Sequence, residues 1–260
     1  MARIVGIHGA FHELWGPNQI HARWFPAILD GLWHHRATAA SDEFEVAFYG
    51  DVFRTRVDQG PPDDVELREV ADRSGFSDVA DALMGPGGID VLAEIIGVTV
   101  ARRLLHQLGR YFADDGVRDM VGRRLEATIS DDTSVIIAHS MGSVIAYEWL
   151  CHNPDLPVRT LITLGSPLGG PFVQASLLPS ARQGIRPWPA GLDSWVNVAA
   201  VGDSVVVESN LAKLFDGPVQ DVAVDNGART HDAEPYLNAF VTGAALAQAL
   251  GRPVGIDAWT

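Results

Sequence analysis

Short runs of apolar residues recur along the chain, separated by longer stretches whose apolar residues return every three or four positions. Short apolar runs bounded by glycine or polar residues are typical of buried strands, and the longer period is typical of amphipathic helices. Strands are predicted at 3–7, 45–49, 158–164, 195–201 and 219–224, and in the apolar run that starts at Val135 and stops before Ser140. Helices are predicted at 20–36, 117–129, 143–150 and 235–250.

Strands that alternate with helices indicate βαβ units and therefore a mostly parallel sheet. We expect one α/β domain over residues 1–260, with about six strands flanked by helices, because the chain shows no repeat and no domain boundary. Residues 168–194 are rich in proline and glycine, and we expect them to form a mobile rim.

The stretch between the second and third predicted strands is longer than one crossover helix requires. Residues 57–66 hold prolines and aspartates and are predicted as loop, and most of 67–129 is predicted as helix, interrupted at the glycine cluster 84–88. We expect residues 63–130 to be a helical insertion before the third strand that contributes a partial cap. The glycine cluster lacks a preceding strand and a following Lys-Ser or Lys-Thr, so it is not a phosphate loop.

Composition narrows the function classes. The formal net charge is −14, which argues against nucleic acid or an anionic membrane as a partner, because both require a basic surface. Cys151 is the only cysteine, so no intramolecular disulfide can form. We expect no membrane span, because charges interrupt residues 89–105, and no signal peptide, because the N-terminus turns polar too soon. Cytoplasmic localisation is the default expectation.

The sequence VIIAHSMG, residues 135–142, contains the candidate nucleophile. A β-favouring run stops at Ser140, small residues lie two positions away on either side at Ala138 and Gly142, and a helical pattern follows without a linker. This layout is typical of a nucleophile elbow in its A-x-S-x-G form, where a tight turn needs small neighbours. We expect the hydroxyl of Ser140 to stand above the end of its strand.

A serine hydroxyl needs a base, and the base needs an acid that fixes its tautomer. Among nine histidines we select His231, in a polar loop after the last strand. His34 and His35 are expected at the surface, and His139 is expected to point away from the nucleophile. The acid we select is Asp203, just past a strand end, with Asp193, Asp225 and Asp232 as the alternatives.

Acyl transfer also needs backbone N–H donors for the oxyanion. Met141 begins the helix after the elbow and is the expected first donor. The second is expected from the loop after the first strand, where Gly9 allows close approach, with Ala10 as our choice and Phe11 as the alternate. We expect the His8 side chain to brace this loop.

Together, the loop at His8-Gly9, the elbow and the chain order Ser140, Asp203, His231 resemble the α/β-hydrolase superfamily over essentially the whole chain. The loop and elbow are similar to those of small bacterial lipases and esterases, and residues 164–169 (LGSPLG) are similar to lipase-like and acyltransferase-like hydrolases. Residues 139–142 with 146–148 also resemble type II thioesterases, although the loop at 8–11 and the histidine context differ. The resemblance implies a serine hydrolase that forms an acyl-serine, with no metal and no organic cofactor.

Three functions stay open at this point. The first is cleavage of a carboxylic ester with a small or medium apolar acyl group, that is, a small-molecule acyl substrate. The second is a thioesterase or acyltransferase acting on a carrier-bound acyl chain, and the third is a non-catalytic binding protein that kept the fold. Six apolar residues are expected either to line an acyl pocket or to belong to the ordinary core: Leu168, Phe172, Leu177, Leu178, Trp188 and Trp195. The oligomeric state is left open.

Overall fold

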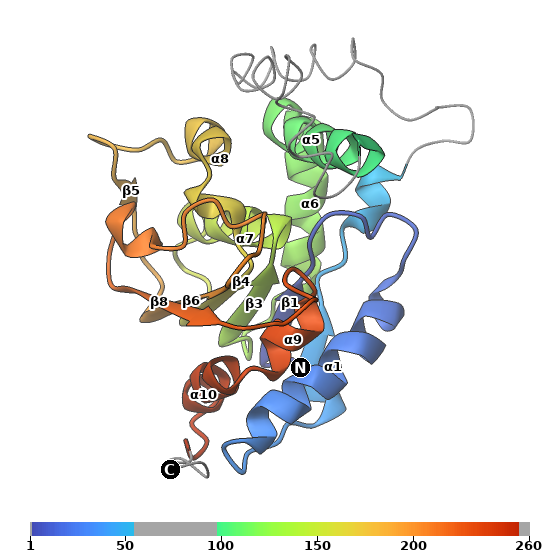
Figure 1. Ribbon diagram of the computed structural model, residues 1–260, viewed down its shortest axis with the longest axis vertical. Helices are drawn as coiled ribbons and strands as arrows, with labels where there is room; N and C mark the ends of the chain where they lie inside the picture. Colours follow the sequence, from blue (N-terminus) through green and yellow to red (C-terminus); the bar gives the residue numbers. More distant parts are fainter. Residues whose placement is uncertain (1, 55–97, 255–260) are drawn as a thin grey trace.

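The computed structural model of the protein describes residues 2–54 and 98–254 (Figure 1). The predicted loop at 57–66, the glycine cluster at 84–88 and the first part of the predicted insertion at 63–130 lie outside the described residues. The later part of that insertion contains two helices, α5 (Val98–Ala113) and α6 (Asp115–Thr128). The second of these confirms the helix predicted over 117–129.

A six-stranded, wholly parallel sheet forms the centre of the molecule, in the order β2-β1-β3-β4-β6-β8. This confirms the predicted α/β architecture with a mostly parallel sheet. The six strands are β1 (Ile4–Ile7), β2 (Phe44–Val46), β3 (Val135–His139), β4 (Thr160–Leu164), β6 (Ser194–Ala200) and β8 (Val219–Val224). Each predicted strand matches one of them within a few residues.

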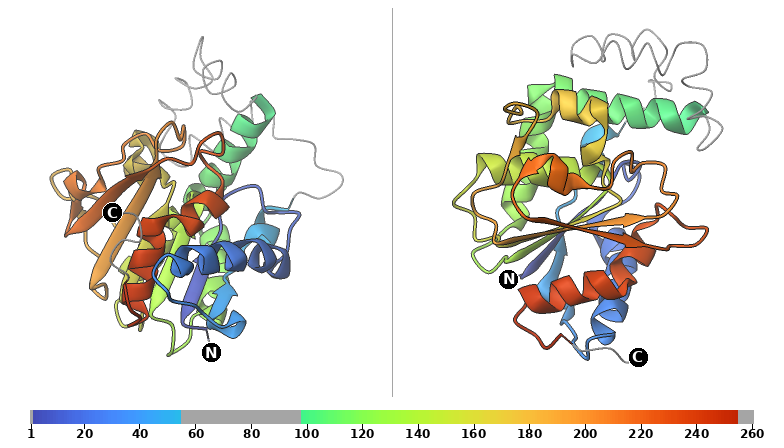
Figure 2. Two further views of the ribbon diagram at one scale, coloured as in Figure 1. Left: turned by 60° about the horizontal axis from the view of Figure 1, so that its bottom comes forward. Right: turned by 60° about the vertical axis from the view of Figure 1, so that its left-hand side comes forward.

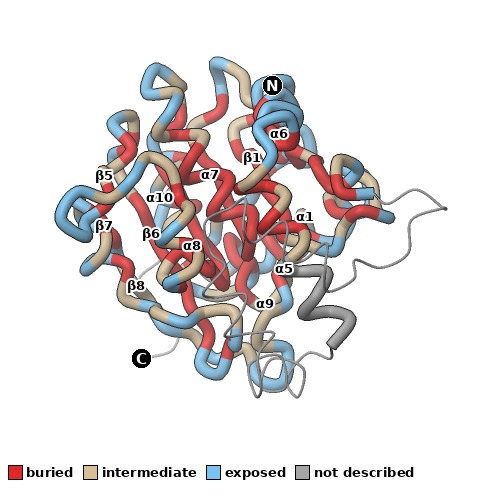
Figure 3. The backbone as a smooth tube through the Cα atoms, turned by 90° about the horizontal axis from the view of Figure 1, so that it is seen from above, coloured by how far each residue is buried: buried red, intermediate tan, exposed pale blue. Residues whose placement is uncertain are grey.

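Helices cover both faces of the sheet (Figures 1 and 2). One layer contains α1 (Pro17–Trp33), α9 (Ala233–Asn238) and α10 (Phe240–Ala249), and the other contains α5, α6, α7 (Met141–His152) and α8 (Pro171–Ser176). Alternate residues of each strand point to opposite faces, so Val5 and Ile136 join the core under α7 while Ile4 and Val135 join the core under α1. Both faces are therefore apolar, and the buried residues run through the middle of the molecule (Figure 3).

Several local features differ from the sequence-based expectation. The single helix predicted at 235–250 is two helices, divided at Ala239, whose ψ of 141° is extended. The break lets α10 pack closely on α1, where a Cβ at Gly243 would lie 1.9 Å from the Gly31 carbonyl oxygen. No breaker residue marks this position in the sequence, and only the packing decides it.

The surface expectation for His35 is wrong, because His35 is fully buried and its Nε2 donates to the Phe240 carbonyl at 2.8 Å. The rim at 168–194 contains α8 and β5 (Arg186–Pro187), which pairs with β7 (Phe215–Asp216) in a small second sheet. Short 3₁₀ turns complete the connections at η1 (Ser41–Glu43), η2 (Gly50–Phe53), η3 (Pro167–Gly169) and η4 (Leu211–Lys213). Among the described helices, none is both long and apolar enough to cross a bilayer.

Candidate active site

Ser140 lies in the turn between β3 and α7, with φ +53° and ψ −129°. This backbone conformation is rare for a side-chain-bearing residue and costs on the order of 1–3 kcal/mol, which the surrounding contacts must offset. The Ser140 N–H donates to the Leu164 carbonyl at 2.9 Å. A Cβ at Gly142 would lie 2.3 Å from the Ile7 carbonyl oxygen, so the turn tolerates only glycine there. The strand–turn–helix layout predicted for an elbow is thus present.

The structure brings the three predicted triad residues together from three strand ends. Ser140 Oγ lies 2.9 Å from His231 Nε2, and His231 Nδ1 lies 2.8 Å from Asp203 Oδ2. Because the carboxylate accepts from Nδ1–H, Nε2 carries the lone pair that accepts the Ser140 hydroxyl proton. His231 can therefore act as a base toward Ser140.

The Asp203 side chain is fully buried and accepts three hydrogen bonds, one of them from His231. The Tyr236 hydroxyl donates to Oδ2 at 2.6 Å, and the Val205 N–H donates to Oδ1 at 3.0 Å. Burial by itself raises the pKa of Asp203, but the hydrogen bond and charge of His231, with the bonds from Tyr236 and Val205, outweigh it and leave the pKa below the ordinary value. The carboxylate is therefore ionised at neutral pH.

The three alternative acids lie elsewhere. Asp193 lines a different pocket, together with Arg159 and Ser194. Asp225 accepts from the Gly227 N–H at 2.8 Å, and Asp232 pairs with Arg229 at 2.5 Å. Sequence reasoning did not find Tyr236, which reaches Asp203 from α9, because a tyrosine in a helix gives no chemical signal by itself.

Gly165 makes room for the triad immediately after β4. Its φ is +53°, and a Cβ there would lie 2.9 Å from Asp203 Oδ2 and 3.2 Å from His231 Nδ1. A side chain at this position would be strained and would displace the Asp203–His231 pair. The run Leu164-Gly165-Ser166 belongs to the segment with a lipase-like resemblance, but the need for glycine at 165 arises only because Asp203 and His231 pack against it.

The His139 side chain packs against His231. The two imidazole rings are 4.8 Å apart, and His139 Nε2 donates to the His231 backbone carbonyl at 2.8 Å. Burial, followed by repulsion from His231, lowers the pKa of His139 to about 3. His139 is therefore uncharged at neutral pH and holds the loop that bears His231.

The loop after β1 packs directly on Ser140. A Cβ at Gly9 would lie 2.8 Å from the Ser140 Cβ, so only glycine permits this approach. The Met141 N–H begins α7 and has no carbonyl four residues earlier in its helix. His8 is buried, and its Nδ1 donates to the Gly9 carbonyl at 2.7 Å, so it braces the loop.

A pocket of about 380 Å³ opens on Ser140 and His231. Ala10 and Phe11 line it, and its remaining wall includes Trp15, Trp24, Val205 and the Arg23–Glu234 ion pair, whose N–O distance is 2.5 Å. The pocket therefore combines an aromatic wall with a charge-paired edge.

The residues assigned from the sequence to an acyl pocket lie elsewhere. Leu168 is fully buried, while Phe172 and Trp188 pack against the same core cluster under α7. None of the three lines the pocket at Ser140. Their arrangement corresponds to the core-packing alternative, and the aromatic wall is contributed by α1 and the loop before it.

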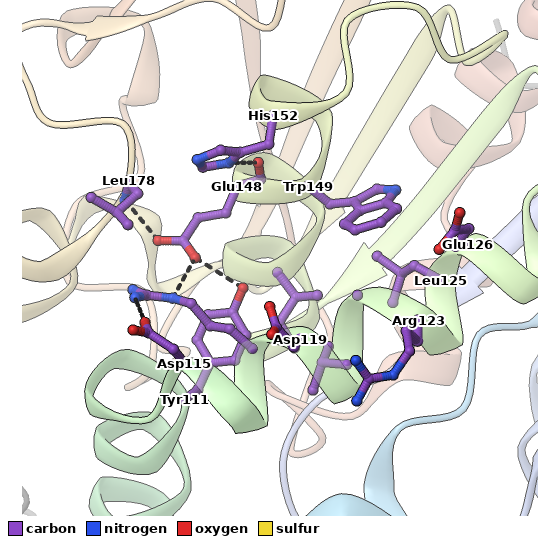
Figure 4. A pocket seen from close by; sticks show the side chains of 14 residues that line it. Tyr111, Asp115, Asp119, Arg123, Leu125, Glu126, Glu148, Trp149, His152 and Leu178 are labelled. Atoms are coloured by element: carbon purple, nitrogen blue, oxygen red, sulfur yellow. Dashed lines mark hydrogen bonds and ion pairs between the residues drawn. The ribbon is translucent and has the colours of Figure 1, made fainter.

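A second pocket, of about 550 Å³, lies between α6 and α7 (Figure 4). Its most buried charge is Glu148, which accepts from the Tyr111 hydroxyl at 2.9 Å and the Leu178 N–H at 2.6 Å and pairs with Arg118 at 3.3 Å. Burial raises the pKa of Glu148 above its ordinary value, although Arg118 opposes this. None of the predicted catalytic residues lines this pocket.

Within residues 2–54 and 98–254, no group of three or more histidine, cysteine, aspartate or glutamate side chains is placed to hold a metal ion. No known family model, curated protein or solved structure matches the chain. The assignment of function therefore depends on the geometry of the site.

Proposed function

We propose that this protein is a serine hydrolase of the α/β-hydrolase superfamily that cleaves a carboxylic ester. The observation that carries the proposal is the hydrogen-bonded series from Ser140 through His231 to Asp203, with distances of 2.9 and 2.8 Å. The three residues follow β3, β6 and β8 at one edge of a parallel sheet, and they occur in the chain order typical of that superfamily. The strained conformation of Ser140 adds support, because such strain persists where surrounding structure enforces it.

In the proposed mechanism, His231 takes the proton of Ser140 while Oγ attacks the ester carbonyl carbon. The proton then passes from His231 to the leaving alkoxide, which departs as the alcohol and leaves an acyl-serine. Water, deprotonated by the same imidazole, attacks the acyl-serine and releases the acid. Asp203 keeps Nδ1 protonated and stabilises the imidazolium that forms twice in each cycle.

The N–H groups of Met141 and Ala10 supply the oxyanion donors in this proposal. Loss of one such donor lowers kcat by about 10²–10³ in well-studied enzymes. The size and aromatic wall of the pocket favour a small or medium apolar acyl ester, because about 380 Å³ admits a short chain or a single ring.

The test is intact-mass detection of a fluorophosphonate adduct, followed by peptide mapping. Wild type is expected to gain one adduct on Ser140, and Ser140→Ala and His231→Ala are expected to gain none. Ser204→Ala is the matched control, because Ser204 is exposed beside Asp203 and lies outside the relay. A folded wild type that gains no adduct would remove the proposal.

The leaving group is tested separately by kinetics on butyryl esters and on the N-acetylcysteamine thioester of the same acid. Higher kcat/KM on the ester is expected. Preferential turnover of the thioester would instead assign the thioesterase or acyltransferase function.

A further inference from the structure

Side chains of His8, His12 and Gln107 form hydrogen bonds with the backbone of the loop after β1. These bonds occupy both the C=O and the N–H of one peptide group in the loop, but only the C=O of the other. In the Gly9–Ala10 peptide, the carbonyl accepts from Nδ1 of His8 at 2.7 Å and from Nδ1 of His12 at 3.1 Å. The C=O and N–H of a trans peptide point in opposite directions, so these bonds turn the Ala10 N–H away from both imidazoles. No residue in the described part of the chain accepts that N–H.

The next peptide, Ala10–Phe11, is bonded at both ends. Its carbonyl accepts from His12 Nδ1 at 2.8 Å, and its N–H donates to Gln107 Oε1 at 3.2 Å. Phe11 is held at φ +66°, in the left-handed region that non-glycine residues seldom adopt. The Phe11 N–H is therefore already used, whereas the Ala10 N–H is available beside Ser140.

Gln107 reaches this loop from α5, far away in the sequence, and is buried. Its Nε2 donates to Glu13 Oε2 at 3.1 Å. A carboxylate can only accept, so this bond decides which end of the amide faces Phe11 and directs Oε1 to the Phe11 N–H. The bond to Glu13 therefore makes Gln107 present its carbonyl oxygen, an acceptor, to the Phe11 N–H.

We propose that Gln107 is a positioning residue that engages the Phe11 N–H and leaves the Ala10 N–H as the second oxyanion donor. This inference rests on the proposed hydrolase function. In this proposal, the buried amide of Gln107 connects α5 to the loop beside Ser140.

The experiment measures the maximal rate and the apparent affinity of Ser140 labelling by a fluorophosphonate, whose P=O oxygen occupies the oxyanion position. In Gln107→Glu a carboxylate faces Glu13, so like charges replace a hydrogen bond and the loop shifts. The maximal labelling rate is expected to fall about 10- to 100-fold, with the apparent affinity within about twofold of wild type. Gln248→Glu, the same substitution on the exposed side of α10, is the matched control and is expected to label at the wild-type rate.

The double variant Glu13→Gln/Gln107→Glu reverses the polarity of the pair while keeping both partners. The amide at position 13 can donate to the carboxylate at position 107, which still accepts from Phe11. Labelling is expected to return to within about threefold of wild type. Thermal denaturation of each variant accompanies the kinetics, and the double variant carries the test where the single variant fails to fold.

The outcomes separate the two proposals. A folded wild type that is not labelled removes the hydrolase function and this inference with it. A labelled wild type together with an unimpaired Gln107→Glu, or with a double variant as slow as the single, overturns the inference alone. A change confined to the apparent affinity also overturns it, because Gln107 would then act on probe binding.

Discussion

Tyr236→Phe removes the hydroxyl that bonds Asp203, and the resulting loss of stability can be worked out from two hydrogen bonds. Tyr236 is fully buried, its hydroxyl donates to Asp203 Oδ2 at 2.6 Å, and the same oxygen accepts from the Ala200 N–H at 2.8 Å. A hydrogen bond to a charged group contributes about 1.5–3 kcal/mol, and an unpaired buried N–H costs about 1–3 kcal/mol. The free energy of unfolding at pH 7 should therefore fall by about 3–5 kcal/mol, which corresponds to a fall in Tm on the order of 10 °C.

Part of this loss should depend on pH. The hydroxyl is one of the donors that hold the pKa of Asp203 below its ordinary value of 3.8. A group with a lowered folded-state pKa contributes stability above its unfolded pKa, and that stability is lost as pH falls through the folded value. The difference in unfolding free energy between wild type and Tyr236→Phe should thus be largest near pH 7. It should become smaller as the pH falls below 3.8, the ordinary pKa of an aspartate.

Urea unfolding followed by tryptophan fluorescence, at several pH values from 7 down to about 2.5, measures this difference, because the predicted change lies below the ordinary pKa of Asp203. Tyr147→Phe is the matched control, because Tyr147 is also fully buried but donates to a neutral acceptor, the Pro187 carbonyl, at 2.9 Å. Its loss of stability should not change over the same range. If the two variants show the same pH dependence, the charge-assisted bond to Asp203 is refuted.

Three further perturbations test other contacts. Gly165→Ala should lower kcat/KM for ester hydrolysis at least 100-fold, because the added Cβ displaces the Asp203 carboxylate. Gly227→Ala is the control: its φ is +57° and no atom lies within 4 Å of the added Cβ, so only backbone strain should lower its stability and kcat/KM should stay near wild type. The imidazole of His139 should show no NMR titration between pH 5 and 8, because its pKa is about 3, and a midpoint in that range would contradict its burial against the base. Glu148→Ala should destabilise the fold by about 3–5 kcal/mol because Arg118 loses its buried partner; a loss below about 1 kcal/mol in urea unfolding would show that the pair contributes little.

Much of the architecture could be predicted because strands and helices follow the local period of apolar residues. All six strands of the main sheet were located, since each is a short apolar run with a clear end. The break at Ala239 and the burial of His35 could not be predicted, because both arise from the close approach of α10 to α1. The two-residue strands β5 and β7 are too short to show any period.

The candidate site divides in the same way. The elbow pattern predicts Ser140, and the expectation that polar residues after parallel strands meet at one edge of the sheet predicts His231 and Asp203. The structure places these three side chains within hydrogen-bond distance of one another. The sequence does not predict the pocket wall, because Trp24 looks like an ordinary amphipathic helix position and Trp15 precedes that helix. Their place beside the site depends on how α1 packs.

Residue types at the strand ends, and the places where the chain can turn tightly, can be read from short stretches of sequence, because backbone sterics and the apolar period act over a few neighbouring residues. Three contacts arise only from packing: the bond of Tyr236 to Asp203, the bond of His139 to the His231 carbonyl, and the bond of Phe11 to Gln107. Each of these is a hydrogen bond between segments 33 to 96 residues apart. Such bonds depend on distances of about 3 Å that exist only after the layers have packed, and no local pattern encodes them.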